Sequence, residues 1–141
     1  MKPIFEITEH TTDTAGYTYL VFALFDLLGM KFSPRIRDLK DQKLYKIENK
    51  SYKQLDSRIA GSINVDFILK HWDDFKRVAG SLKSGHVTAS LYISKLQSYP
   101  RKNNITLALQ EYGKLIRTIY ILEYLEDEEY RRHIQTQLNK G

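Results

Sequence analysis

The sequence predicts a mainly α-helical fold that opens with a short β-α-β unit. Three observations lead to this prediction. A short β-type run comes first, in which apolar and polar residues mix over residues 4–10. An apolar run from Gly16 to Leu28 then has the length and composition of a buried helix. Beyond Arg37, apolar residues recur at helical spacing through most of the chain. We therefore expect two parts: residues 1–37, which hold the β-α-β unit, and residues 38–141, which are helical.

The β-α-β unit places one carboxylate between a strand and a helix. Its helix is ended by Gly29, and its second strand is predicted from Met30 to Ile36. Asp13 lies between the first strand and the helix. Enzymes with α/β folds use this layout to present a metal ligand or a base. On spacing alone another interpretation is favoured, in which one of residues 12–14 caps the helix by accepting an N–H hydrogen bond.

The first long helix expected in the second part runs from Asn64 to Leu82. Asn64 is placed to cap it. Its apolar residues recur as one stripe at helical spacing, namely Val65, Ile68, Leu69, Trp72, Phe75, Val78, Ala79 and Leu82. A tryptophan could stack on a nucleic-acid base, but one that lies in register with a complete apolar stripe is usually packed inside. We therefore predict that Trp72 is a core residue and not part of a binding site.

Three more helices are predicted towards the carboxyl end. The first spans Thr88–Tyr99 and is ended by Pro100, which cannot continue the hydrogen-bond ladder. A longer helix runs from about Asn104 to Glu126, and a last helix begins near Asp127. The stretch Glu48–Gly61 is polar and aperiodic, so it is predicted to be a loop.

Composition narrows the class of protein. The 141 residues are 42% hydrophobic and 28% charged, which fits one domain able to bury a core. The chain contains no cysteine, so it forms neither disulfides nor a thiolate zinc site. No apolar run reaches the length of a membrane span, and the first residues lack a signal-peptide pattern. We expect a cytoplasmic protein with no membrane partner.

The charge distribution is compatible with a polyanionic partner. Lysine and arginine outnumber aspartate and glutamate by 22 to 17, a net charge of +5. A basic cluster directly after the predicted second strand holds Arg35, Arg37, Lys40, Lys43 and Lys46, and Arg101 and Lys102 lie in a polar turn between helices. Such residues can contact DNA phosphates, which set affinity and position without reading sequence. An ordinary solvated basic face explains them equally well.

Several long segments of the chain match one family in their order along the sequence. They are TTDTAGYT, FALFDLLG, FSPRIRDL, DQKLY, INVDFILKHWDDF, GHVTAS, LQSYPRKN and LNKG. With these segments the chain closely resembles the DDE transposases of class II replicative transposons, the TnpA family of the Tn-three type. The resemblance covers nearly the whole chain, so it is far more specific than a single short motif.

The resemblance implies a fold and one catalytic residue. In this family an RNase H-like domain holds two aspartates and a glutamate, and the second aspartate lies in the TDT segment, which gives Asp13 here. The implied architecture is a β-α-β fragment of an RNase H-like domain followed by an all-helical insertion. The first aspartate is expected upstream of this chain, and the glutamate directly after LNKG. One departure is Tyr19, because the family commonly has an acidic residue after GYT.

The implied activity is DNA cleavage and strand transfer at transposon ends, with magnesium as cofactor and Asp13 as a metal ligand. Its partners would be transposon-end and target DNA and the remainder of the transposase chain. Whether the chain also pairs with a second copy of itself is left open. Magnesium is usually held by one or two carboxylates together with substrate phosphates. Because one ligand of three is present, we expect the isolated chain to be inactive.

Two alternatives come from other classes of protein. One is a noncatalytic helical DNA-binding module, which the basic clusters and the helical content would suit. The other is a truncated transposase remnant without activity. Extending the reading frame in both directions would distinguish these alternatives. An aspartate on an upstream strand and a glutamate directly after LNKG would identify the transposase.

Overall fold

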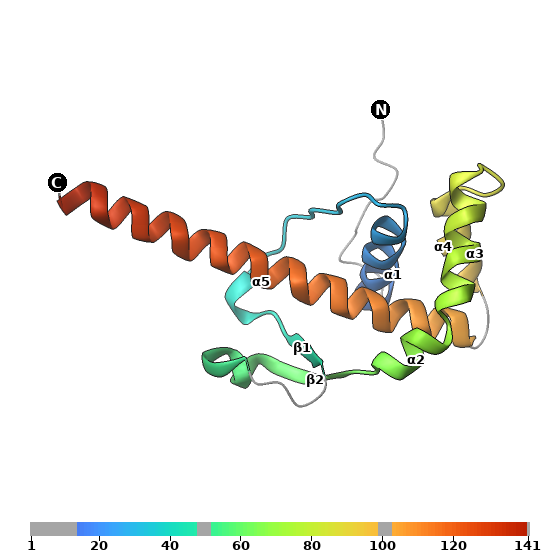
Figure 1. Cartoon of the computed structure of the whole chain (residues 1–141), viewed down its shortest axis with the longest axis horizontal. Helices are drawn as coiled ribbons and strands as arrows, with labels where there is room; N and C mark the ends of the chain where they lie inside the picture. Colours follow the sequence, from blue (N-terminus) through green and yellow to red (C-terminus); the bar gives the residue numbers. More distant parts are fainter. Residues whose placement is uncertain (1–13, 48–51, 99–102, 141) are drawn as a thin grey trace.

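The computed structural model describes residues 14–47, 52–98 and 103–140 (Figure 1). Within these ranges the protein is mainly α-helical, as predicted, and contains one small parallel sheet. The predicted first strand lies outside the described residues. The elements are α1 (Thr14–Leu27), the 3-10 helix η1 (Leu39–Asp41), β1 (Leu44–Ile47), the 3-10 helix η2 (Lys53–Arg58), β2 (Ile59–Ile63), α2 (Val65–Lys70), α3 (Trp72–Lys83), α4 (Ala89–Ser98) and α5 (Asn104–Lys140).

Helix α1 is the centre of the core. Its consecutive residues 20–24 are all at most 1% exposed. Since a helix turns by about 100° per residue, five consecutive buried residues require neighbours on every side. The helix ends as predicted at Gly29, which adopts a left-handed φ of 74°. The N–H groups of Gly29 and Met30 donate to the carbonyls of Asp26 and Phe25, which is the Schellman arrangement of a helix end.

Helix α5 is the longest element and crosses α1 at very short range (Figure 1). Gly113 marks the crossing: a Cβ atom added there would lie 1.8 Å from the carbonyl oxygen of Tyr19. Leu109 and Tyr112 of α5 are buried against the same core as α1. Only a glycine at position 113 lets the two backbones touch in this way.

The predicted helix over residues 64–82 is present but interrupted. Asn64 caps α2 as predicted, because its Oδ1 accepts the N–H of Phe67 at 3.1 Å. His71 lies between α2 and α3, and its Nδ1 lies 3.1 Å from the carbonyl oxygen of Phe67. The prediction that Trp72 is a core residue is wrong, since its side chain is 36% exposed. Its ring packs edge-on against Phe75 and Tyr112 and leaves the remainder to solvent.

Met30–Ile36, predicted as a second strand, does not form one in the described structure. The segment is irregular, although its residues alternate between exposed and half-buried like those of a strand. The alternation arises because one side of it packs on α1: the ring of Phe32 lies 4.9 Å from that of Phe22 and 5.2 Å from that of Phe25. Packing on a helix, and not strand pairing, therefore accounts for the half-buried position of Phe32.

The observed strands lie further along the chain, so the prediction of an all-helical part after residue 37 is wrong. Strand β1 pairs in parallel with β2, with Tyr45 opposite Gly61 and Ile47 opposite Ile63. Strand β2 and η2 also correct the predicted loop over Glu48–Gly61, of which residues 48–51 lie outside the described ranges. The pair rests on α5, where the N–H of Tyr45 donates to Oγ1 of the buried Thr118.

Two helices predicted near the carboxyl end form a single helix. The expected break near Asp127 is absent, and α5 continues to Lys140. No glycine or proline interrupts this stretch, and Arg132 pairs with Glu128 one turn earlier at 2.6 Å. Tyr130 and Leu138 of this last part of α5 are more than 60% exposed. Helix α4 is confirmed over Ala89–Ser98, and the residues at its predicted end lie outside the described part of the chain.

The hydrogen bond between Tyr112 and Asp26 predicts how the stability of the protein changes at alkaline pH. The hydroxyl of Tyr112 donates to Oδ2 of Asp26, and burial, then this hydrogen bond, raises the pKa of Tyr112 above its usual value. Below about pH 10 both folded and unfolded forms keep the proton. Above it the unfolded chain loses the proton first, so the free energy of unfolding should fall as pH rises.

We predict that Tyr112→Phe lowers stability at neutral pH but makes stability decline less steeply above about pH 10. Urea unfolding of parent and variant across the alkaline range measures both effects. If the free energies of unfolding of parent and variant fall in parallel as the pH rises, the Tyr112 phenol titrates alike in the folded and unfolded states, and the prediction is contradicted.

Candidate functional site

The structure describes three of the six residues proposed from the sequence as site residues. Asp13, Arg101 and Lys102 lie outside the described residues. Helix α1 begins at Thr14, the next residue in the chain after Asp13. Arg35, Arg37 and Lys40 are described, and all three side chains are exposed on the connection between α1 and β1.

Arg35 and Lys40 line different hollows of the surface. Arg35 borders a cleft of about 530 Å³ beside α1, whereas Lys40 borders a groove between η2 and the second half of α5. Arg37 lines neither, and its carbonyl accepts a hydrogen bond from Nε2 of Gln42 at 2.9 Å. The three cations therefore belong to one exposed connection and not to one pocket.

The cleft beside α1 brings together residues from four parts of the chain. Ala15, Thr18 and Tyr19 of α1 form one wall, and residues 34–36 form another. Residues 41–43 and Tyr45 close the third side, and α5 contributes Arg117. Three cations, from Arg35, Lys43 and Arg117, line the cleft together with the single carboxylate of Asp41.

Hydrogen bonds hold Arg117 in a fixed orientation in the lining of this cleft. One guanidinium nitrogen donates to Oε1 of Gln42 at 2.6 Å, and another lies 3.4 Å from the carbonyl oxygen of Lys43. Burial lowers the pKa of Arg117, while the nearby phenols of Tyr19 and Tyr45 act in the opposite direction. Because arginine stays protonated in proteins, the site holds a partly desolvated positive charge.

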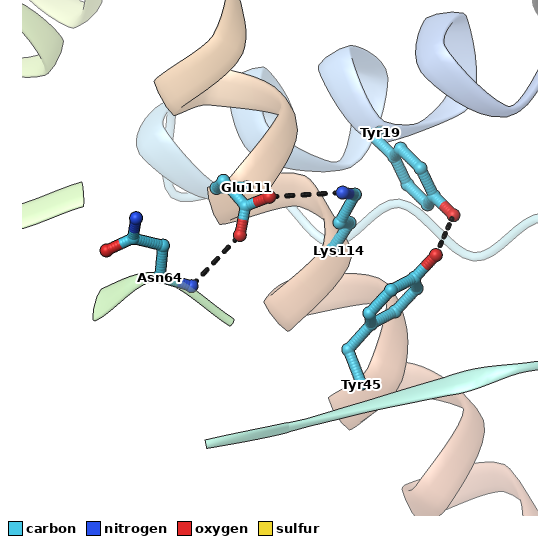
Figure 2. A network of polar contacts seen from close by, with 5 residues as sticks. All are labelled: Tyr19, Tyr45, Asn64, Glu111 and Lys114. Carbon is cyan, nitrogen blue, oxygen red and sulfur yellow. Dashed lines mark hydrogen bonds and ion pairs between the residues drawn. The ribbon is translucent and has the colours of Figure 1, made fainter. Parts of the chain in front are cut away.

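A network of aromatic and charged groups lies next to the cleft (Figure 2). The hydroxyl groups of Tyr19 and Tyr45 are 3.5 Å apart, and Nζ of Lys114 lies 5.8 and 5.1 Å from the centres of their rings. Lys114 pairs with Glu111 at 3.0 Å, and Glu111 also accepts the backbone N–H of Asn64 at 3.0 Å. The network therefore joins α1, β1, α5 and the residue that begins α2.

This network gives Tyr19 a structural role. Burial is the main cause that raises the pKa of Tyr19, followed by the contact with Tyr45, so the phenol stays neutral at physiological pH. The ring also packs edge-on against that of Tyr45, with their centres 6.3 Å apart. A neutral tyrosine at this position is a packing residue and a cation–π partner.

The described residues hold no group of three or more histidine, aspartate or glutamate side chains that could bind a metal ion. Asp13, the metal ligand that the resemblance implies, lies outside these residues. Within the same residues, no helix is long and apolar enough to cross a membrane.

Comparison with known proteins decides the family. A model of the Tn3 transposase DDE domain matches residues 2–141. The chain belongs to this family. This match confirms the resemblance found in the sequence segments. The helices and strands described above are therefore part of a Tn3 transposase DDE domain. No solved structure matches the chain.

Several transposases are similar to this Tn3-family chain over most of its length. The transposase for transposon Tn501 of Pseudomonas aeruginosa is 50% identical over 136 residues, and that for Tn2501 of Escherichia coli is 51% identical over 139 residues. The transposase for transposon gamma-delta of Escherichia coli is 42% identical over 135 residues. These alignments cover 94–96% of this chain but only 13–14% of each relative.

Sequence reasoning missed Arg117 as a site residue. It lies in the predicted helix over residues 104–126, and a single arginine on a helix is usually an ordinary solvated charge. Its partners Gln42 and Lys43 are 74 to 75 residues away in the chain. Only the packing of α5 beside β1 brings these groups together, so no local signal could have identified them.

Proposed function

We propose that this chain is part of a transposase that cleaves DNA at transposon ends and joins it to target DNA in replicative transposition. The observation that carries the proposal is the match of the Tn3 transposase DDE domain to residues 2–141. Since the chain spans about 14% of the curated relatives, the activity belongs to the longer protein. Its partners are transposon-end and target DNA, the rest of the transposase, and a second transposase copy.

Within that protein we propose Asp13 as a catalytic residue and metal ligand. The proposal rests on the TDT segment in which Asp13 lies, directly before α1. Magnesium would supply activation of the attacking oxygen and stabilisation of the leaving oxygen in the in-line displacement. The chain's own contribution is a carboxylate that directly precedes α1, a helix anchored by the buried residues 20–24, which suits a ligand that must be held in place.

We propose Arg35, Arg37, Lys40, Arg101 and Lys102 as residues that contact DNA phosphates. The exposure of the first three supports this role, because their charges are accessible to a polyanion. Their positions on one short connection after α1 also place them in the same region of the chain as the cleft. They would hold DNA without reading its sequence.

We predict that the purified chain alone neither nicks nor joins DNA that carries transposon ends, in magnesium or in manganese. One carboxylate of the family's three is too few to hold the metal ions for this chemistry. The assay is gel separation of labelled transposon-end DNA after incubation with the chain. Cleavage above background that disappears in Asp13→Asn would mean that the chain holds a complete site.

We predict that replacing Arg35, Arg37 and Lys40 together by alanine flattens the salt dependence of duplex DNA binding. If each residue neutralises one phosphate, the slope of log affinity against log salt falls by about 0.9 per residue removed. Sequence preference should stay unchanged. Fluorescence anisotropy over a series of salt concentrations measures the slope.

The control for this experiment is a triple alanine variant of Lys70, Lys83 and Lys95, which removes the same charge from exposed positions on α2, α3 and α4. It should keep most of the parent slope. If the parent and the variant of Arg35, Arg37 and Lys40 have equal slopes, these three residues do not contact DNA and form an ordinary solvated face. Arg101 and Lys102 would then be the next residues to test.

A further inference from the structure

We propose that the cleft beside α1 binds one phosphodiester group of a DNA strand, with Lys43 and Arg117 as its contacts. This inference rests on the proposed function, because it takes the ligand to be DNA. It adds a defined binding site, in which Lys43 of the basic cluster meets Arg117, a residue that neither the sequence segments nor the family match assigns.

The charge of the cleft supports an anionic ligand. Arg35, Lys43 and Arg117 approach it from three parts of the chain, and Asp41 is the single carboxylate that lines it. Like charges brought together in a folded protein repel one another, so a convergence of cations costs stability unless an anion binds. The guanidinium of Arg117 is in addition partly buried, and an anion there would meet a donor that has already lost much of its water.

Hydrogen bonds fix the donor before any ligand arrives. Gln42 and the carbonyl of Lys43 orient the guanidinium of Arg117 at 2.6 and 3.4 Å. Arg58 donates in turn to the carbonyls of Leu39 and Gln42, which fixes the backbone that carries these partners. A preorganised cation loses less side-chain entropy on binding than a free lysine or arginine on the surface.

The shape of the cleft suits a nucleotide unit better than a bare phosphate ion. Its volume of about 530 Å³ is in the range of small-molecule sites and exceeds the space that one phosphate fills. Pro34, Ile36 and the ring of Tyr45 give it apolar surface next to the cations. Such surface can accommodate a sugar or a base edge while the cations bind the phosphate.

The position of the cleft in the chain favours binding of a DNA segment close to the one that reacts. Its wall begins at Ala15, two residues after Asp13 in the chain. A strand held by Lys43 and Arg117 would therefore be anchored beside the beginning of α1, the helix that directly follows Asp13 in the chain. Such an anchor positions DNA and contributes no chemistry of its own.

The test measures binding of a short single-stranded DNA oligonucleotide to the 141-residue chain at several salt concentrations. We expect Lys43→Ala to lower the salt slope by about 0.7, the value for one phosphate on a single strand, and Lys43→Arg to restore it. Lys95→Ala removes the same charge from an exposed position on α4 and should leave the slope unchanged. Adding Arg117→Gln to Lys43→Ala should weaken binding about tenfold further, or about 1.4 kcal/mol.

A second measurement locates the ligand and separates its sources. Titration with the oligonucleotide should shift the amide NMR signals of residues 42–45 and Arg35, and inorganic phosphate should shift them only at far higher concentration. Shifts by phosphate alone, or oligonucleotide shifts confined to other residues, would overturn the proposal. So would a Lys43→Ala variant that melts like the parent and keeps the parent slope.

The outcome is separable from that of the proposed function. Lys43 and Arg117 are not part of the Arg35, Arg37 and Lys40 variant. If that variant loses its salt dependence while Lys43→Ala does not, the chain still binds DNA as a transposase segment and only the cleft assignment is wrong. If the chain binds no DNA at low salt, the cleft and the phosphate contacts of Arg35, Arg37 and Lys40 are both contradicted, whereas the family assignment is not affected.

Discussion

The backbones of α1 and α5 touch where Gly113 meets Tyr19, and the rest of the structure depends on this crossing. The same part of α5 also holds three segments outside α1: Glu111 accepts the N–H of Asn64, Thr118 accepts the N–H of Tyr45, and Arg117 donates to Gln42. Helix α1 joins this assembly through Tyr19, whose ring lies 5.8 Å from Nζ of Lys114 and whose hydroxyl lies 3.5 Å from that of Tyr45. If the two helices stood further apart, these contacts of Tyr19 would be lost, because hydrogen bonds tolerate changes of only a few tenths of an ångström.

The crossing also links the core to the proposed function. Helix α1 directly follows Asp13 and forms one wall of the basic cleft, while α5 supplies Arg117, the least exposed of the three cations that line it. A rigid α1 is useful to a protein that must keep a catalytic carboxylate and a DNA strand in fixed positions relative to each other. Small displacements at a reacting centre lower the reaction rate strongly. The buried residues 20–24 and the network around Lys114 supply this rigidity from both sides of the helix.

The sequence predicts local features of this protein well and tertiary ones poorly. The end of α1 at Gly29 and the cap at Asn64 follow from neighbouring residues, so they could be predicted. Strand β2 could not, because Gly61 and Ser62 have little strand preference and the strand exists through its pairing with β1. Trp72 fits an apolar stripe by spacing, but the depth of a side chain depends on what covers it. Asp13 rests on family resemblance, whereas Arg117 emerges only when residues far apart in the chain meet.

The most direct test of the central crossing is the free energy of unfolding of Gly113→Ala compared with Gly80→Ala. Both glycines lie inside helices, but an added methyl group meets nothing within 4 Å at Gly80 and the Tyr19 backbone at Gly113. Alanine should therefore stabilise α3 at position 80 by about 0.5–1 kcal/mol. At position 113 it should destabilise the protein by about 3 kcal/mol or more, because the helices must separate. Stabilisation by Gly113→Ala equal to that at Gly80 would contradict the close crossing.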